Sequence, residues 1–416
     1  MDFDINTYLN YFKDFDINAY LDSLPEDTKC IYLESRNLTF IPSLERFKNL
    51  EELYCDNNEL TSLPSLNENL QTLNCSDNQL TSLPSLNEKL QILNCQYNEL
   101  TSLPCLNKNL RVLICSDNEL TSLPSLNENL EELYCDNNQL TSLPYLNENL
   151  RELNCVCNEL TSLPSLNENL EELYCNNNQL FSLPSLNKKL HSLQCNNNKL
   201  SSLPYLNENL HSLQCNTNHL TSLPYLNENL QELNCHNNHL TSLPSLNENL
   251  KELYCECNHL TSLPSLNENL QELNCNTNHL TSLPSLNKNL QILYCWDNHL
   301  TSLPSLNEKL QSLFCWDNEL TSLPYLNENL REIHFNNNPI CKIIDIEIEK
   351  DICNKQIQTL NNFRHLYWCL KFKKQLNKWL WEKIREPNIM KQYHPNYLFK
   401  NLQEDTDLNK FLDNLV

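Results

Sequence analysis

The sequence contains no glycine among its 416 residues. Glycine lets a backbone approach a phosphate closely or make the sharp turn that presents a reactive serine. The P-loop, the G-x-G-x-x-G dinucleotide turn and the G-x-S-x-G nucleophile elbow all require it. Nucleotide-binding proteins and hydrolases that use those loops are therefore excluded. Asparagine, which tolerates left-handed backbone conformations, is expected to take glycine's place at tight turns.

Long apolar runs and positive charge are also scarce. No apolar run approaches the length of a membrane span, and the acidic start, Met1-Asp2-Phe3-Asp4, lacks the apolar region of a signal peptide. Residues 341–416 carry 13 basic and 10 acidic residues, so residues 1–340 carry the other 16 basic and 43 acidic ones. A surface this acidic repels nucleic-acid phosphates and anionic membranes. We expect an intracellular protein with a protein partner that has a basic patch.

What the sequence does contain is a twenty-residue unit that begins at Leu50 and recurs until Leu330. Its skeleton is L-x-x-L-x-C-x-x-N-x-L-x-x-L-P-x-L. This pattern resembles the leucine-rich-repeat family, in particular the short, proline-bearing repeats of bacterial proteins. The resemblance covers most of the chain and implies a curved solenoid.

Within each unit, the alternation in Leu53-Tyr54-Cys55 predicts a short strand. The residues expected to face inward are Leu50, Leu53, Cys55, Leu60, Leu63 and Leu66, with their counterparts in the other units. One coil has nothing to bury them against, so stability must come from the neighbouring coils. We predict an α/β-type solenoid that is mostly β, a horseshoe of about 16 coils with parallel strands on its concave side.

Two further columns support this fold. Asn58 recurs in every unit to Asn338, which indicates a buried ladder that bonds the backbone after each strand, although a lone asparagine is usually a surface turn. Pro64 recurs to Pro324 and predicts an extended, polyproline-like return on the convex side, with no full helix.

Fourteen of the 21 cysteines form a column from Cys55 to Cys315. Their number alone suggests disulfides or zinc. Their position suggests small buried core residues, because no C-x-x-C pair exists and the spacing is that of the repeat. Many free thiols fit a reducing, intracellular compartment. We expect no metal and no cofactor.

The array is expected to have a cap at each end. Residues 1–27 hold a tandem duplication, in which Asp2-Phe3-Asp4-Ile5-Asn6 returns as Asp14-Phe15-Asp16-Ile17-Asn18. It predicts short amphipathic helices that cap a solenoid at residues 28–340, with a linear docking motif as the alternative. Residues 341–416 are predicted to form a helical C-terminal cap or tail, with one helix over 354–386 and shorter ones from about 396 and at 408–415.

The tail also carries a resemblance of its own. The segment 379–390, followed by Tyr393-His394-Pro395, is similar to a tail shared by repeat proteins of giant DNA viruses. The resemblance implies the host cytoplasm as the location and no established chemistry. The basic, aromatic helix is interpreted as the core of a cap, with binding to nucleic acid or a membrane surface as the alternative.

The candidate binding residues lie on two adjacent units, where positions that point outward carry large aromatic side chains. Tyr294 and Phe314 occupy one outward column, and Trp296 and Trp316, each followed by an aspartate, occupy the next. We predict a concave patch that binds a protein partner. Its residues are Tyr294, Trp296, Asp297, Phe314, Trp316, Asp317 and His334. The alternative is that Cys-Trp-Asp-Asn was simply copied when the repeat duplicated.

A second column consists of five successive histidines, His219, His239, His259, His279 and His299. Neighbouring rings are expected about 5 Å apart. A metal site needs convergent ligands, whereas a parallel ladder offers one nitrogen at each level. This column is interpreted as the product of duplication.

These observations favour a non-enzymatic, monomeric protein-binding scaffold with no small-molecule substrate. One alternative is a ubiquitin ligase, since some bacterial effectors with similar repeats append a ligase domain that has a catalytic Cys-x-Asp motif. None of Cys341, Cys353 and Cys369 has an aspartate two residues later, so none forms that motif. The tail is also short for such a domain. The other alternative is a tether to nucleic acid or a membrane through the basic C-terminal helix, which predicts salt-dependent binding.

Overall fold

A computed structural model describes residues 15–344 and 350–371 of the chain. The chain divides into two compact units. The first comprises residues 1–321 and 327–339, and the second comprises residues 322–326 and 340–416.

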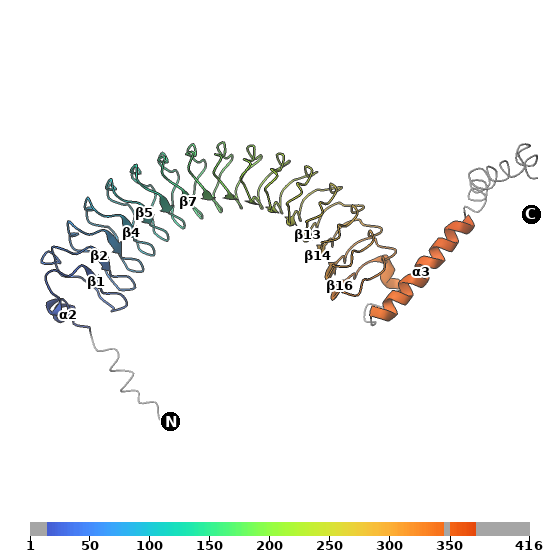
Figure 1. The fold of residues 1–416 in the computed structure, drawn as a ribbon, viewed down its shortest axis with the longest axis horizontal. Helices are drawn as coiled ribbons and strands as arrows, with labels where there is room; N and C mark the ends of the chain where they lie inside the picture. The colour runs from blue at the N-terminus through green and yellow to red at the C-terminus, as the bar shows by residue number, and fades with distance from the viewer. Residues whose placement is uncertain (1–14, 345–349, 372–416) are drawn as a thin grey trace, which may run out of the picture. The chain divides into compact units, whose positions relative to one another are not determined.

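The first unit contains one parallel sheet whose strand order is the order of the sequence (Figure 1). The strands are β1 (Cys30–Tyr32), β2 (Glu52–Tyr54), β3 (Thr72–Asn74), β4 (Ile92–Asn94), β5 (Val112–Ile114), β6 (Glu132–Tyr134), β7 (Glu152–Asn154), β8 (Glu172–Tyr174), β9 (Ser192–Gln194), β10 (Ser212–Gln214), β11 (Glu232–Asn234), β12 (Glu252–Tyr254), β13 (Glu272–Asn274), β14 (Ile292–Tyr294), β15 (Ser312–Phe314) and β16 (Glu332–His334). Residues twenty positions apart are partners, as Leu53 is with Leu73. The predicted solenoid is confirmed, with the strands along the inner side of an arc.

The core follows the columns of the repeat. Leu50, Leu53, Cys55, Leu60 and their counterparts in the next thirteen coils are at most 1% exposed. The leucines beside the proline were also predicted to face inward, and for most coils this is wrong. Leu63 and Leu66 are only half-buried, because no helix separates any two of the sixteen strands, and so no further layer covers the convex side.

The asparagine ladder is confirmed. Asn198 is typical: its Nδ2 donates to the carbonyl oxygens of Cys175, Cys195 and Asn196 at 3.0–3.1 Å. Its Oδ1 accepts from the backbone N–H of Leu180 at 3.0 Å. The amide thus satisfies backbone groups of two coils at the point where the strand ends. The column is buried from Asn118 onward and half-buried in the first three coils.

Two further asparagine columns, which were not predicted to have a structural role, bond the convex segment. Asn167 Nδ2 donates to the carbonyl oxygens of Asn147 and Leu150 at 2.7 and 2.9 Å. Asn169 Nδ2 donates to the carbonyl oxygen of Glu148 at 2.7 Å. Each coil is therefore joined to the previous one by side-chain amides on both sides of the core.

The turn after each strand explains how the chain folds without glycine. In every coil from Asn57 to Asn337 the residue before the ladder asparagine has a φ of 48–54°. Asn or Asp fills ten of these fifteen positions, as expected for left-handed backbone. The other five are Tyr97, Cys157, Thr217, Cys257 and Thr277. The ladder on either side therefore holds even β-branched residues in a left-handed turn.

The N-terminal end begins with helix α2 (Ile17–Ser23). Asp16 caps it, since its Oδ1 accepts from the N–H groups of Asn18 and Ala19 at 3.0 and 3.1 Å. Ile17 and Leu21 are buried. The helix predicted for the second half of the duplication is confirmed, and the first half lies outside the described residues.

The second unit contains helix α3 (Lys350–Lys371) and all of the 3₁₀ helix η2 (Pro339–Lys342) except its first residue. Asn354 Nδ2 donates to the carbonyl oxygen of Leu326, and Asn354 Oδ1 accepts from the N–H of the same residue, both at 3.0 Å. The predicted helix over 354–386 begins four residues earlier than expected. Several predictions lie outside the described residues. They are the part of this helix after Lys371, the helices from 396 and at 408–415, and the segment 379–390. Neither described helix is long and apolar enough to cross a membrane.

Candidate protein-binding surface

The predicted aromatic residues lie together on the last three coils of the sheet. Their rings form two stacks. Tyr294, Phe314 and His334 stack with centroids 4.7 and 5.2 Å apart, and Trp296 stacks on Trp316 at 4.9 Å. The Trp316 ring meets the rings of Phe314 and His334 edge-on, at 87° and 81°. We call these five residues the aromatic patch, and the predicted proximity is confirmed.

The register of the sheet produces this arrangement. Tyr294, Phe314 and His334 end three successive strands and are direct partners. The inward residues before and after them are held by the core, so the aromatic side chains project from the sheet face. The four carbon-rich rings are half-buried by each other and His334 is exposed. Aromatic side chains left half-exposed in a group are typical of protein-binding surfaces.

Asp297 and Asp317, which were predicted to bind a partner beside the tryptophans, have a structural role as well. Both are exposed, and both have the left-handed conformation, with φ of 52° and 51°. Asp317 Oδ1 also accepts from Asn337 Nδ2 at 2.8 Å. Aspartate at these positions is therefore explained by the turn without any partner.

The sheet face also carries two glutamate triplets, which column-by-column inspection of the strands could have found. The first consists of Glu132, Glu152 and Glu172 on β6–β8, and the second of Glu232, Glu252 and Glu272 on β11–β13. Tyrosines on the same strands donate to them, as Tyr254 does to Glu252 at 3.1 Å. Burial, and then the charges of Glu172 and Glu132, raise the pKa of Glu152. Like charges on adjacent parallel strands favour a partner of opposite charge.

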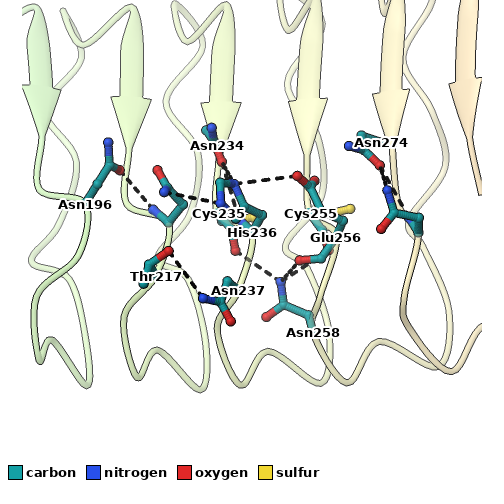
Figure 2. Close-up of polar contacts among 12 residues, drawn as sticks. Asn196, Thr217, Asn234, Cys235, His236, Asn237, Cys255, Glu256, Asn258 and Asn274 are labelled. Carbon is teal, nitrogen blue, oxygen red and sulfur yellow. Dashed lines mark hydrogen bonds and ion pairs between the residues drawn. The ribbon is translucent and has the colours of Figure 1, made fainter.

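Glu256 and His236, which follow β12 and β11, form a polar contact (Figure 2). Glu256 Oε1 lies 3.6 Å from His236 Nδ1, which also lies 2.7 Å from Asn234 Oδ1. Glu256 Oε2 is buried and has no hydrogen-bond partner among the described residues. Burial, and then the charge of Glu272, raise the pKa of Glu256, against a backbone hydrogen bond that lowers it. Burial lowers the pKa of His236. Both groups are therefore shifted towards their neutral forms.

Replacing Glu256 with glutamine is expected to raise the free energy of unfolding by about 1 kcal/mol at pH 8, because the neutral amide avoids the cost of holding a charged carboxylate in a largely buried place. The raised pKa means that folded Glu256 keeps its proton where the unfolded chain has lost it, so wild-type stability falls as pH rises above 4.5. His236 acts in the opposite sense, since its lowered pKa reduces stability as pH falls below 6.5. His236 is present in both proteins, so its own titration largely cancels from their difference. Urea denaturation of both proteins at pH 4 and pH 8 measures this, and an equal difference at the two pH values would contradict the assignment.

The histidine column is a stack of exposed rings rather than a cluster of ligands. Neighbouring centroids from His219 to His299 lie 5.7–6.0 Å apart with nearly parallel planes. Within the described residues, no group of three or more His, Cys, Asp or Glu side chains is placed to hold a metal ion.

The column cysteines are all buried. Burial raises the pKa of Cys95, Cys155 and Cys195 to about 12. At Cys195 the thiol also lies 3.4 Å from the carbonyl oxygen of Gln214 on the next coil. The thiols are therefore core residues with little thiolate character.

Comparison with known proteins agrees with this geometry. A family model described as Leucine Rich repeats (2 copies) matches residues 108–148 and 228–268. The solved structure of YopM from Yersinia enterocolitica is 33% identical, with a TM-score of 0.67 over 76% of this chain and 80% of that one. YopM from Yersinia pestis, described as a leucine-rich effector protein, is 30% identical, with a TM-score of 0.64 over 80% and 94% of the two chains.

A third solved structure shares the cysteine column. The functional domain of InlJ from Listeria monocytogenes, which is described as including a cysteine ladder, is 29% identical, with a TM-score of 0.60. The match covers 71% of this chain and 69% of that one. The search of curated proteins found no match.

Proposed function

We propose that this chain, which belongs to the leucine-rich-repeat family, is a non-enzymatic scaffold that binds a partner protein on the inner face of its sheet. Leucine-rich repeats are commonly protein-interaction scaffolds, because fixed core columns support side chains that vary from coil to coil. The observation that carries the proposal is the aromatic patch, in which five stacked rings stay partly open to solvent.

The charge of the same face supports a partner with a basic surface. Both glutamate triplets point outward from strands of the sheet that also carries the patch. The one ion pair recorded for them in the described part of the chain joins Glu172 to His191 at 4.0 Å. We place the chain inside the cell, since its many free thiols suit a reducing compartment. The host cytoplasm of a giant virus is the setting that the tail resemblance favours.

The double substitution Trp296→Ala/Trp316→Ala tests the proposal. Removing two anchor tryptophans from an interface is expected to weaken partner binding by roughly a hundred-fold or more. The matched control is Tyr205→Ala/Tyr225→Ala, an exposed aromatic pair on adjacent coils of the convex side, 88% and 85% exposed. Immobilised wild type and both variants are incubated with cytoplasmic extract, and captured proteins are quantified by mass spectrometry. A partner retained by the tryptophan variant and lost by the tyrosine variant would contradict the proposal.

A further inference from the structure

Two pockets at the starts of strands in the first unit are built from the same positions of the repeat, eleven coils apart. The first, of about 410 Å³, is lined by Gln71, Lys89, Gln91, Asn109, Arg111, Asn129 and Glu131. The second, of about 420 Å³, is lined by Gln291, Lys309, Gln311, Glu328, Asn329 and Arg331. The backbone N–H of Arg111 donates to the backbone carbonyl oxygen of Gln91 at 2.8 Å. The backbone N–H of Arg331 donates in the same way to Gln311, also at 2.8 Å. The two pockets can therefore be compared side chain by side chain.

They differ in what the arginine contacts. In the first pocket, Arg111 is neutralised by Glu131 of the next coil, with three contacts of 2.8–2.9 Å. In the second pocket, β16 is the last strand of the described sheet, so no following strand supplies the equivalent acid, and the acid that lines this pocket is Glu328, three residues before the arginine. Within the described residues the Arg331 side chain has no ion pair or hydrogen bond, and it is exposed. Among the described residues, a guanidinium fork suited to bidentate carboxylate binding is thus left without a carboxylate partner.

The second pocket lies at the starts of strands whose ends carry residues of the aromatic patch. Gln311 and Arg331 precede the strands that end in Phe314 and His334. Three residues of strand span about 10 Å. The outward position between the pocket and the patch is Ser312 on β15 and Glu332 on β16, and Glu332 Oε1 lies 3.2 Å from His334 Nε2. The corresponding strands beside the first pocket end in Asn94 and Ile114 and offer no aromatic stack.

We propose that the pocket around Lys309 and Arg331 binds an aspartate or glutamate side chain of the partner protein, next to an apolar or aromatic group held by the patch. This inference rests on the proposed function and adds the partner's chemistry at one position. Because β6–β8 and β11–β13 each present three adjacent glutamates, an acidic segment placed over those strands would be repelled. A pocket that combines Lys309 with an arginine lacking a carboxylate partner among the described residues, on the last strands of the sheet, therefore fixes the register of the partner.

Selection of peptides from a displayed library of random 12-residue segments tests this. On the wild-type protein we expect enrichment of Asp or Glu two to four residues from Trp, Tyr or Phe. Peptides selected on the variant Lys309→Glu/Arg331→Glu should carry Lys or Arg in place of Asp or Glu at that position of the motif. Peptides selected on the wild-type protein should bind this variant at least roughly ten-fold more weakly. The control Lys89→Glu/Arg111→Glu makes the same charge change at the first pocket and should leave the motif and affinity unchanged. Thermal melting of each variant verifies folding.

The outcomes separate this inference from the proposed function. Peptides that require Trp296 and Trp316 but show no acid, or that bind the two charge-reversed variants equally, overturn the carboxylate pocket alone. Selection that yields no peptide dependent on the two tryptophans overturns the binding surface, and the pocket assignment with it.

Discussion

Replacing Asn198 with alanine is expected to lower the free energy of unfolding by about 3–5 kcal/mol, a sum of several unsatisfied backbone groups at about 1–3 kcal/mol each. The side chain bonds three carbonyl oxygens and one N–H, from coils on both sides of a boundary inside the array. Alanine supplies no side-chain donor or acceptor. The space that the asparagine amide leaves beside the core has little room for compensating water.

The position of Asn198 also affects how the array unfolds. Each coil contacts mainly its neighbours, so a weak boundary in the middle should divide one transition into two. Urea denaturation followed by circular dichroism measures both the midpoint and the number of transitions. The control is Ser202→Ala, an exposed residue of the same coil, with an expected change within about 0.5 kcal/mol. Equal midpoints for the two variants would show that the ladder does not hold the coils together.

The column cysteines of the folded protein are expected to react with a thiol reagent at pH 8 far more slowly than exposed ones. Burial raises the pKa of Cys195 to about 12 from 9.0. The thiolate fraction at pH 8 is therefore lower by about a thousand-fold, since each pKa unit is a factor of ten. A raised thiol pKa slows the labelling, because the thiolate is the nucleophile. Steric protection in the core acts in the same direction.

Labelling with 5,5′-dithiobis(2-nitrobenzoate), followed by peptide mass spectrometry, measures the rate at each cysteine. Cys105 and Cys257, which are exposed, should react first. The fourteen column thiols should react only after denaturant is added. A Cys353→Ser/Cys369→Ser background restricts the measurement to the cysteines of residues 15–344. Labelling of column and exposed cysteines at similar rates in folded protein would contradict the assigned core.

The repeat-dependent features could be predicted from the sequence because every unit has the same length. A constant period makes residues twenty apart into neighbours, and the period alone therefore predicts Tyr294 beside Phe314 and Trp296 beside Trp316. The asparagine ladder and the buried cysteines follow from the same period. The exposure of Leu63 and Leu66 does not, since burial there depends on whether another layer covers the convex side.

Features that depend on side-chain conformation or on breaks in the pattern could not be predicted from the period. Glu256 differs from its column neighbours, and only its position against His236 and Glu272 shows that its carboxylate is poorly satisfied. The open guanidinium of Arg331 depends on where the sheet ends. The compact unit that joins residues 322–326 to the C-terminal residues follows from contacts such as that of Asn354 with Leu326, for which the repeat gives no signal.

The most direct test of partner binding on the inner sheet face is a titration with the purified partner captured by the wild-type protein. Its affinity should fall by roughly a hundred-fold or more for Trp296→Ala/Trp316→Ala and stay unchanged for Tyr205→Ala/Tyr225→Ala. Unchanged affinity for the tryptophan variant, with a loss for the tyrosine variant, would place the binding surface on the convex side and contradict the account.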